Sequence, residues 1–140
     1  MDIIFRELVP ADLSRGFLET LAGLAAVDLT VDAAQAVLKE RQETGIRTFV
    51  AADGERVVGT ASLVVEQKFI HGGGLCGRIE EVVVHPDYKN QGIARALVRH
   101  AIAEAEKLSC YKVILNCFDN LVPFYEGCGF RRHDVGMRLH

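Results

Sequence analysis

The stretch IEEVVVHPDYKNQGIARALVRHAIAEAEKL, residues 79–108, decides the fold, because it passes from a strand through a short polar loop into a long helix. Its first segment, Ile79–Val84, is rich in β-branched residues, and His85–Pro86 ends it. After Gly92 the apolar residues recur at spacings of three and four, so they share one face of an amphipathic helix. These residues are Ile93, Leu97, Ala101, Ile102, Ala105 and Leu108.

The loop between this strand and this helix has the composition of an anion site. It consists of Lys89, Asn90, Gln91, Gly92, Ile93 and Ala94. A helix N-terminus leaves backbone N–H groups unpaired and carries the positive end of the helix dipole, and small residues let a bulky anion approach. The loop lacks both the Gly-Lys-Ser/Thr of a Walker loop and a GxGxxG pattern. It therefore predicts either a pyrophosphate site or an ordinary helix start after a turn.

Helices and a hairpin are predicted before this stretch. An apolar stripe after Pro10 predicts a first helix, and Thr30 or Asp32 can cap a second helix that ends before Gly45. The dipeptide Asp53-Gly54 between two β-rich runs, 48–52 and 57–66, predicts a hairpin, because a tight turn needs positive φ angles. The residues of the first stripe are Leu13, Phe17, Leu18, Leu21 and Leu24, and Ala34, Leu38 and Arg41 lie along one side of the second helix.

The remaining segments complete a layered domain. Strands are expected at Ile3–Phe5, 113–115 and 130–139, and a short helix at 121–126. The order is strand, two helices, three strands, helix, strand, short helix and strand. This order predicts a single α/β domain over residues 1–140, of the α+β layered kind, with a mixed central sheet flanked by helices.

Composition excludes several functional classes. The chain has 140 residues, 49% of them hydrophobic, and a net charge of -3, which argues against a nucleic-acid binder or an anionic-membrane binder. Its apolar runs are too short for a membrane span, and Met1-Asp2 opens no basic leader segment. The four cysteines form no CxxC pair, and the histidines have no second ligand at metal spacing. We therefore expect a cytoplasmic enzyme with reduced thiols and no metal.

A second motif completes a known pattern. Phe124-Tyr125 is followed by Glu126-Gly127-Cys128-Gly129-Phe130. Together with the loop 89–94, it makes the chain resemble the GNAT superfamily of N-acetyltransferases. The resemblance implies the GNAT acyltransferase fold, with acetyl-CoA as co-substrate and its pyrophosphate cradled by Lys89–Ala94.

The same resemblance assigns roles to further residues. It implies that Tyr125 binds the cofactor and protonates the departing thiolate, although a lone Tyr in a short helix is more often a core aromatic. The strand residues Val82, Val83 and Val84 would also line the cofactor, with the backbone N–H near Val82 meeting the thioester oxygen. Asn120 is a further expected cofactor contact.

Four blocks narrow the resemblance to the glucosamine 6-phosphate N-acetyltransferases. They are EQKFIH at 66–71, GLCGRIEE at 74–81, CYKVIL at 110–115 and FYEGCGF at 124–130. The resemblance implies direct transfer of an acetyl group to the amine of an amino-sugar phosphate, glucosamine 6-phosphate, for amino-sugar nucleotide synthesis. It also implies a homodimer in which the C-terminal strand, Val135–Leu139, helps to complete the partner's site.

The resemblance also indicates the acceptor site. Glu80 and Glu81 would orient the amino sugar, but adjacent carboxylates on a regular strand point to opposite faces. Both reach one pocket only if a bulge interrupts the strand, and Glu80 is the preferred candidate. Candidate cations for the 6-phosphate are Lys68, His71, Lys112, Arg131, Arg132, Arg138 and, at the C-terminus, His140.

Three positions depart from the pattern of this family. Asn116, a candidate catalytic residue, stands where relatives usually carry an acid, and Leu121 stands where they carry Asn. His140 falls where close relatives have an Arg that holds the sugar phosphate. Two alternatives therefore remain: an acetyltransferase acting on another small amine or a protein amine, and a weakly catalytic acyl-CoA-binding module.

Overall fold

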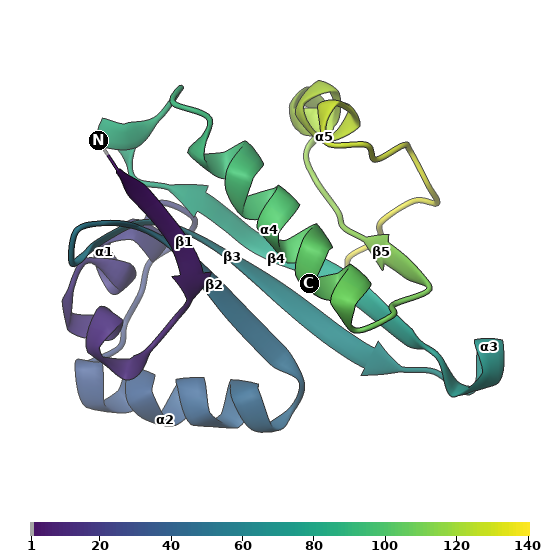
Figure 1. Ribbon diagram of the computed structural model, residues 1–140, viewed down its shortest axis with the longest axis horizontal. Coiled ribbons are helices and arrows are strands. Elements are labelled where there is room, and N and C mark those ends of the chain that lie inside the picture. The colour runs from purple at the N-terminus through teal and green to yellow at the C-terminus, as the bar shows by residue number, and fades with distance from the viewer. Residues whose placement is uncertain (1) are drawn as a thin grey trace.

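Five strands form one mixed sheet in the computed structural model, which describes residues 2–140 (Figure 1). The first four strands pair antiparallel in chain order, and the fifth lies parallel to the fourth at one edge. The strands are β1 (Ile3–Glu7), β2 (Ile46–Asp53), β3 (Arg56–Gln67), β4 (Leu75–Val84) and β5 (Lys112–Ile114). The predicted hairpin is confirmed, because Asp53 pairs with Arg56 around Gly54, whose φ is 61°.

Helices cover both faces of this sheet (Figure 1). One face carries the 3-10 helix η1 (Pro10–Ser14), α1 (Phe17–Leu21) and α2 (Val31–Glu43), and the other carries the long helix α4 (Ile93–Lys107). Short helices occupy the connections: α3 (Ile70–Gly73), η2 (Pro86–Tyr88), η3 (Asp119–Leu121) and α5 (Val122–Gly127). The mixed sheet flanked by helices confirms the predicted fold class.

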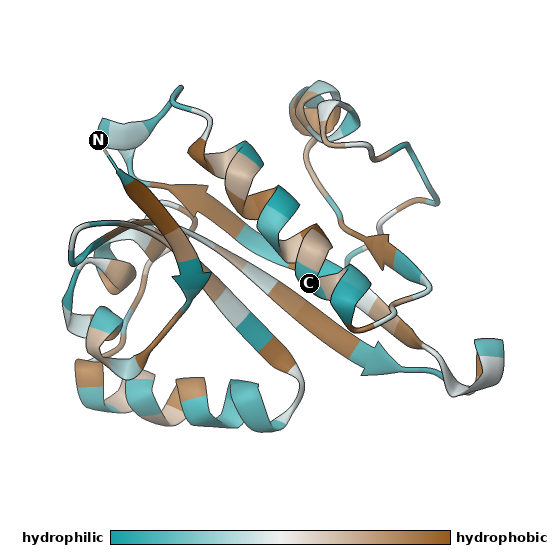
Figure 2. Cartoon of the chain, in the orientation of Figure 1, coloured by the Kyte–Doolittle hydropathy of each residue, from teal (hydrophilic) through white to brown (hydrophobic). Residues whose placement is uncertain are grey.

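Strand alternation divides the core between the two faces. Phe49, Ala51 and Val58 are buried with Leu97 and other α4 residues, whereas their neighbours face the opposite layer. Val50 and Val57 are buried there with Leu13 and Phe17 from η1 and α1 and with Leu38 from α2. In Figure 2 the strands are accordingly dominated by hydrophobic residues, while α2 and α4 mix hydrophilic and hydrophobic ones. The central strands are therefore buried on both sides.

The first predicted helix is broken in two. A 3-10 turn ends at Ser14 and α1 begins at Phe17, because Gly16 between them has a φ of 96°. A Cβ at Gly16 would lie 2.8 Å from the carbonyl oxygen of Val57, so the chain needs glycine where it crosses the hairpin. The second helix behaves as predicted, since the Thr30 hydroxyl accepts the Ala33 N–H at 3.1 Å and caps α2.

The predicted last strand, 130–139, is wrong for the isolated chain. No residue between 130 and 140 is assigned to a strand, and the apolar residues Val135, Met137 and Leu139 are 86, 94 and 89% exposed. The outer edge of β5 is unpaired within residues 2–140, but it is only three residues long, Lys112–Ile114, so it offers few hydrogen bonds to a strand of this length. We refer to residues 130–140 below as the C-terminal tail.

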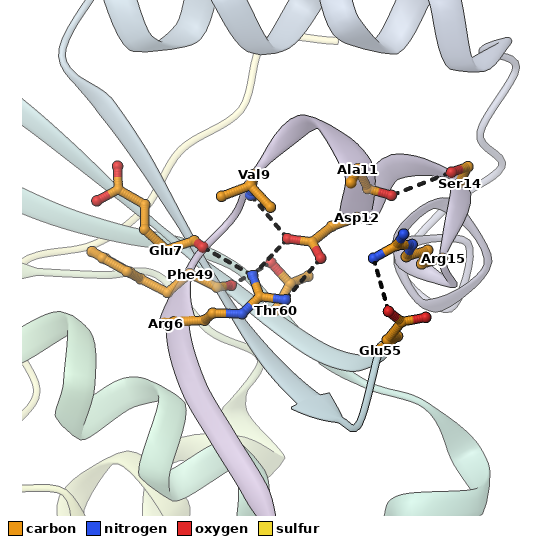
Figure 3. A network of polar contacts seen from close by, with 10 residues as sticks. All are labelled: Arg6, Glu7, Val9, Ala11, Asp12, Ser14, Arg15, Phe49, Glu55 and Thr60. Atoms are coloured by element: carbon orange, nitrogen blue, oxygen red, sulfur yellow. Dashed lines mark hydrogen bonds and ion pairs between the residues drawn. The ribbon is translucent and has the colours of Figure 1, made fainter.

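An ion pair fastens β1 to the turn that follows it (Figure 3). The guanidinium of Arg6 donates two hydrogen bonds, of 2.7 and 2.9 Å, to the buried carboxylate of Asp12, which also accepts the Val9 N–H at 2.9 Å. Burial by itself disfavours the charged carboxylate, but the bonds from Arg6 and Val9 outweigh it and hold the pKa of Asp12 below its usual range. The pair therefore stabilises the fold in its ionised form.

We predict that Asp12→Asn lowers the free energy of unfolding by about 2 kcal/mol at neutral pH, because it removes a charge-assisted bidentate contact. The lowered pKa means that this stability is present above pH ~4 and is lost as the pH falls through the folded-state pKa. Urea unfolding at several pH values measures it. The control is Glu55→Gln, which removes the exposed 3.5 Å pair with Arg15. Equal stability of the two variants at neutral pH would contradict the assignment.

Candidate active site

A bulge in β4 is the central feature of the candidate site. Ser62 of β3 pairs with Glu80, but Thr60 pairs with Val83, so Ala61 faces two residues of β4. The extra residue is accommodated at Glu81, whose φ of 54° is left-handed. The strand therefore contains the bulge that is needed for two adjacent carboxylates to lie on the same side of the sheet.

The bulge changes which β4 side chains share a face. Ile79, Val82 and Val84 all pack in the core beneath α4, although regular alternation would place Ile79 with residues 81 and 83. Val83 faces the other layer, since a Cβ at Gly23, just after α1, would lie 3.2 Å from its methyl group. The two residues between Ile79 and Val82 therefore both avoid the α4 face, which is how Glu80 and Glu81 reach the side of α1 and α2.

The two carboxylates differ in their partners. The Glu81 Oε1 accepts the Ser62 hydroxyl at 3.2 Å and lies 3.1 Å from the Arg41 guanidinium of α2. Glu80 is the more exposed of the two, at 51 against 39%, and its nearest cation is Arg78 at 3.8 Å. The structure thus places Glu81, rather than the preferred Glu80, in a polar network. Glu81 also lines a cavity of about 160 Å³ between this network and the apolar side chains of α1 and α2.

The edge of β4 beside the bulge has no strand against it. Parallel pairing between β4 and β5 covers only Cys76–Arg78 and Lys112–Ile114. Within residues 2–140, the segment 79–84 has a strand partner only on its β3 side, while the chain after β5 turns away toward α5 (Figure 1). The backbone N–H and C=O groups on this side of Val82, Val83 and Val84 therefore have no strand partner within residues 2–140.

The predicted anion loop has the backbone geometry of a cradle. Asn90 and Gly92 have φ angles of 63 and 78°, and a Cβ at Gly92 would meet no atom within 4 Å. The first backbone bond of α4 runs from the Ala96 N–H to the Gly92 carbonyl at 3.1 Å, and no side chain caps the helix. Ile93 is buried and anchors the loop to the core, while Lys89 and Gln91 are exposed. The N–H groups of the first turn therefore have no side-chain cap within residues 2–140 and remain available to an anion.

Tyr125 is a core aromatic residue whose hydroxyl makes no hydrogen bond within residues 2–140. Its ring is buried in the core beneath α4, edge-on to Phe124 at 4.9 Å and to Phe130 at 6.0 Å. Burial raises the pKa of the Tyr125 phenol, and the nearby thiols of Cys117 and Cys128 add to the shift. In residues 2–140 no hydrogen bond engages its hydroxyl, which is also not sealed from solvent. The phenol is therefore protonated at neutral pH and free to donate.

The candidates for phosphate binding lie apart from Glu81. Lys68 and His71 lie beyond the pair of Gln67 with Leu75, roughly 16 Å along the strand from Glu80. Lys68 contacts Glu66 at 3.5 Å, and the His71 ring stacks on Tyr111 at 4.0 Å. One folded chain therefore does not bring these cations to the carboxylates.

The candidates near the C-terminus lie along the tail. A Cβ at Gly136 would be 3.5 Å from the Asn116 amide, so the tail passes Asn116, and Arg132 pairs with Asp119 at 3.6 Å. Asn120 is exposed in η3, and the exposed Arg138 donates to the carbonyl of His140. Lys112 lies 5.7 Å over the ring of Tyr111, and Arg131 is exposed.

Arg41 and Ser62 are polar residues of the site that the sequence interpretation missed. Arg41 shares a helix face with Ala34 and Leu38, which are buried. A charged residue on the apolar face of a helix was the available signal, because such a residue must find polar partners on the layer beneath.

The sequence also led to expectations about metal ligands, membrane spans and cysteines. Residues 2–140 contain no group of three side chains arranged to hold a metal ion, and none of their helices has the length and apolar character to cross a membrane. All four cysteines are free, and burial raises the pKa of the Cys110 and Cys128 thiols. The raised pKa makes the thiols of Cys110 and Cys128 poorer nucleophiles at neutral pH.

Known proteins share this fold and sequence. Residues 17–130 match the Acetyltransferase (GNAT) family. The glucosamine 6-phosphate N-acetyltransferase of Trypanosoma brucei brucei is 37% identical over 99% of this chain and 96% of that protein. The enzyme of the same name from Schizosaccharomyces pombe is 46% identical over 63% of this chain and 79% of that protein.

Solved structures of related proteins have the same fold. A crystal structure of a Trypanosoma brucei acetyltransferase is 39% identical, covers 99% of both chains and has a TM-score of 0.94. The glucosamine-6-phosphate N-acetyltransferase of Arabidopsis thaliana is 26% identical, with a TM-score of 0.95 over 100% of this chain and 99% of that one. The bulged β4 strand and the open loop before α4 thus occur in a chain that belongs to the acetyltransferase (GNAT) family.

Proposed function

We propose that this acetyltransferase transfers the acetyl group of acetyl-CoA to the amino group of glucosamine 6-phosphate, giving N-acetylglucosamine 6-phosphate and CoA. The observation that carries the proposal is the β4 bulge, which turns two adjacent carboxylates toward one side of the sheet, next to an unpaired strand edge. A carboxylate pair accepts the several hydroxyl and amine hydrogen bonds of an amino sugar. Relatives named for this reaction span almost the whole chain.

The chemistry follows from these groups. The neutral amine attacks the thioester carbonyl, and the oxygen that gains charge is met by the backbone N–H near Val82. Collapse of the tetrahedral intermediate breaks the carbon–sulfur bond, and the protonated phenol of Tyr125 supplies the proton that the leaving thiolate takes up. The proton lost by the amine passes to a carboxylate of the site or to water. We assign orientation of the acceptor to Glu80 and Glu81, and a hydrogen bond near the reacting groups to Asn116.

The cofactor would lie across the α4 side of the same edge. We place its pyrophosphate against the N–H groups of Gln91–Ala94, with Lys89, Asn90 and Asn120 as polar neighbours. Support comes from the absence of any atom near the Cβ position of Gly92 and from the uncapped N-terminus of α4. This site needs no strongly basic surface, which fits a net charge of -3.

We also propose that the enzyme is a cytoplasmic homodimer. Four free cysteines fit a reducing compartment. The exposed apolar residues of the C-terminal tail need a surface to cover them. A second copy could also bring Lys68, His71, Arg138 or His140 to a site whose own cations already lie against Glu80 and Glu81. Sedimentation velocity on the same enzyme preparation that is used in the acceptor assay below tests this: a homodimer should have twice the 15.4 kDa mass of one chain.

We predict that Gly92→Ala weakens acetyl-CoA binding about tenfold, because its methyl group enters the space left for the pyrophosphate. The matched control is Gly54→Ala in the hairpin turn, where φ is also positive and a Cβ also meets no atom within 4 Å. Both variants share a backbone cost of about 1–2 kcal/mol. Calorimetric titration with CoA separates them, and equal affinities in the two variants would overturn the cradle.

We predict that Tyr125→Phe lowers kcat by about 100-fold, as loss of a general acid does, and leaves CoA affinity unchanged. Tyr111→Phe is the control, since its buried hydroxyl has no hydrogen-bond partner in the described chain. Steady-state assays of CoA release measure both. Wild-type turnover in Tyr125→Phe would leave Tyr125 with its core role alone.

We predict that glucosamine 6-phosphate has a kcat/KM at least 100-fold above that of glucosamine, because a phosphate dianion held by charged hydrogen bonds gains far more than a hydroxyl. His140→Arg should widen this ratio, since Arg is always charged and grips phosphate with two donors. The measurement is CoA-thiol release with a panel of amino sugars, polyamines and peptide amines. If the enzyme acetylates another amine but not glucosamine 6-phosphate, the proposed acceptor is wrong. If it acetylates no amine, the result favours an acyl-CoA-binding module.

A further inference from the structure

Arg41 connects helix α2 to three strands at the bulge. One guanidinium nitrogen, Nη2, donates to the Ser62 hydroxyl at 2.8 Å and to the Thr48 hydroxyl at 3.2 Å. The other, Nη1, lies 3.1 Å from the Glu81 carboxylate. The side chain thus spans β2, β3 and β4 at the polar end of the cavity beneath α1 and α2.

The contacts on Glu81 are unequal between its two oxygens. Both the Ser62 hydroxyl, at 3.2 Å, and Arg41 act on Oε1. The hydrogen bond from Ser62 is the only side-chain hydrogen bond to Glu81 within residues 2–140, and it leaves Oε2 without one. A carboxylate held through one oxygen is fixed in direction, and its second oxygen keeps its lone pairs for a ligand.

We propose that Arg41 is a positioning residue for the acceptor: with Ser62 it holds Glu81 so that Oε2 accepts a hydrogen bond from the amine or a hydroxyl of the sugar. This inference rests on the proposed function, because it takes Glu81 as part of the acceptor site. It adds a residue of the second helix to a site otherwise built on β4 and the loops around it.

Backbone geometry explains why the carboxylate needs such a hold. Glu81 occupies the left-handed region, where the extra residue of a bulge is not directed by a regular strand partner. Its side chain is 39% exposed and, without a partner, would sample several rotamers in water. Arg41, only 25% exposed and held by two hydroxyls, restricts that sampling.

Charge balance points the same way. The guanidinium compensates the charge of Glu81, so the carboxylate acts on the acceptor through direction rather than through net attraction of cations. A carboxylate that is already fixed in direction does not have to be ordered when the acceptor binds, so the hold on Glu81 contributes to acceptor affinity.

The test is the kinetics of Arg41→Met, which keeps the apolar stem and removes the donors. The KM for the acceptor should rise about tenfold, because the charge-assisted contact that holds the Glu81 carboxylate is lost. The KM for acetyl-CoA should stay unchanged and kcat should stay within about twofold of the wild-type value. Arg41→Lys should recover part of the acceptor KM, since an ammonium supplies charge without the fork of donors. Ser62→Ala should show a smaller rise of the same kind.

Arg47→Met is the matched control. Arg47 is similarly exposed, at 31%, and its ion pairs with Glu7 at 2.7 Å and Glu104 at 3.2 Å do not involve β4. The Arg47→Met variant should be less stable than the wild type but should have the same KM for the acceptor. Thermal unfolding of all variants identifies any that fail to fold, and Arg41→Lys and Ser62→Ala then carry the test.

A double-mutant cycle separates positioning from general stability. Glu81→Gln should raise the acceptor KM, and adding Arg41→Met should raise it no further, since the residue to be positioned is already altered. An unchanged acceptor KM in Arg41→Met, additive effects in the cycle, or an equal rise in Arg47→Met would each overturn the proposal. The cycle is run with whichever amine the wild type acetylates, so that rejection of glucosamine 6-phosphate would overturn the proposed function while Arg41 is still tested.

Discussion

The extra residue in β4 is the constraint on which the rest of the site depends. Without it, Ile79 would share a face with residues 81 and 83, one carboxylate would turn toward α4, and Val82 would leave the core. With it, apolar residues 79, 82 and 84 stay beneath α4 while both acids face the other layer. The sheet thereby supplies, within one strand, a hydrophobic anchor, an unpaired backbone edge and an acidic surface.

Local sequence signals predicted most of the fold because they act over a few residues. Asp53-Gly54 specifies a tight turn, Thr30 a helix cap, and the stripe from Ile93 to Leu108 a helix. The broken first helix was not predictable from its stripe, because the reason for Gly16 is the carbonyl of Val57, more than 40 residues away. The missing last strand has a similar cause: alternation predicts a strand, but pairing depends on a neighbouring edge, and the edge strand β5 is only three residues long.

The candidate site divides in the same way. The loop before α4 and Tyr125 follow from contiguous motifs, and the structure shows that the loop leads into an uncapped helix and that Tyr125 is buried beneath α4. The choice between Glu80 and Glu81 depended on a bulge whose presence cannot be read from alternation, and the network on Glu81 depends on Arg41, 40 residues earlier in the chain. Side chains that meet across layers carry no local signature, so Arg41 was visible only as a charge on a buried helix face.

The alternation of β2 and β3 between two separate cores has an evolutionary consequence. Val50 and Val57 are buried in the α1–α2 layer, whereas Phe49, Ala51 and Val58 are buried in the α4 layer, so among residues 2–140 the two layers have separate clusters of buried side chains on either side of the sheet. Substitutions in α1 and α2 can reshape the surface around Glu81 while the residues that support the loop before α4 keep their neighbours. A lineage with this architecture can exchange one amine for another and retain the same acyl donor throughout.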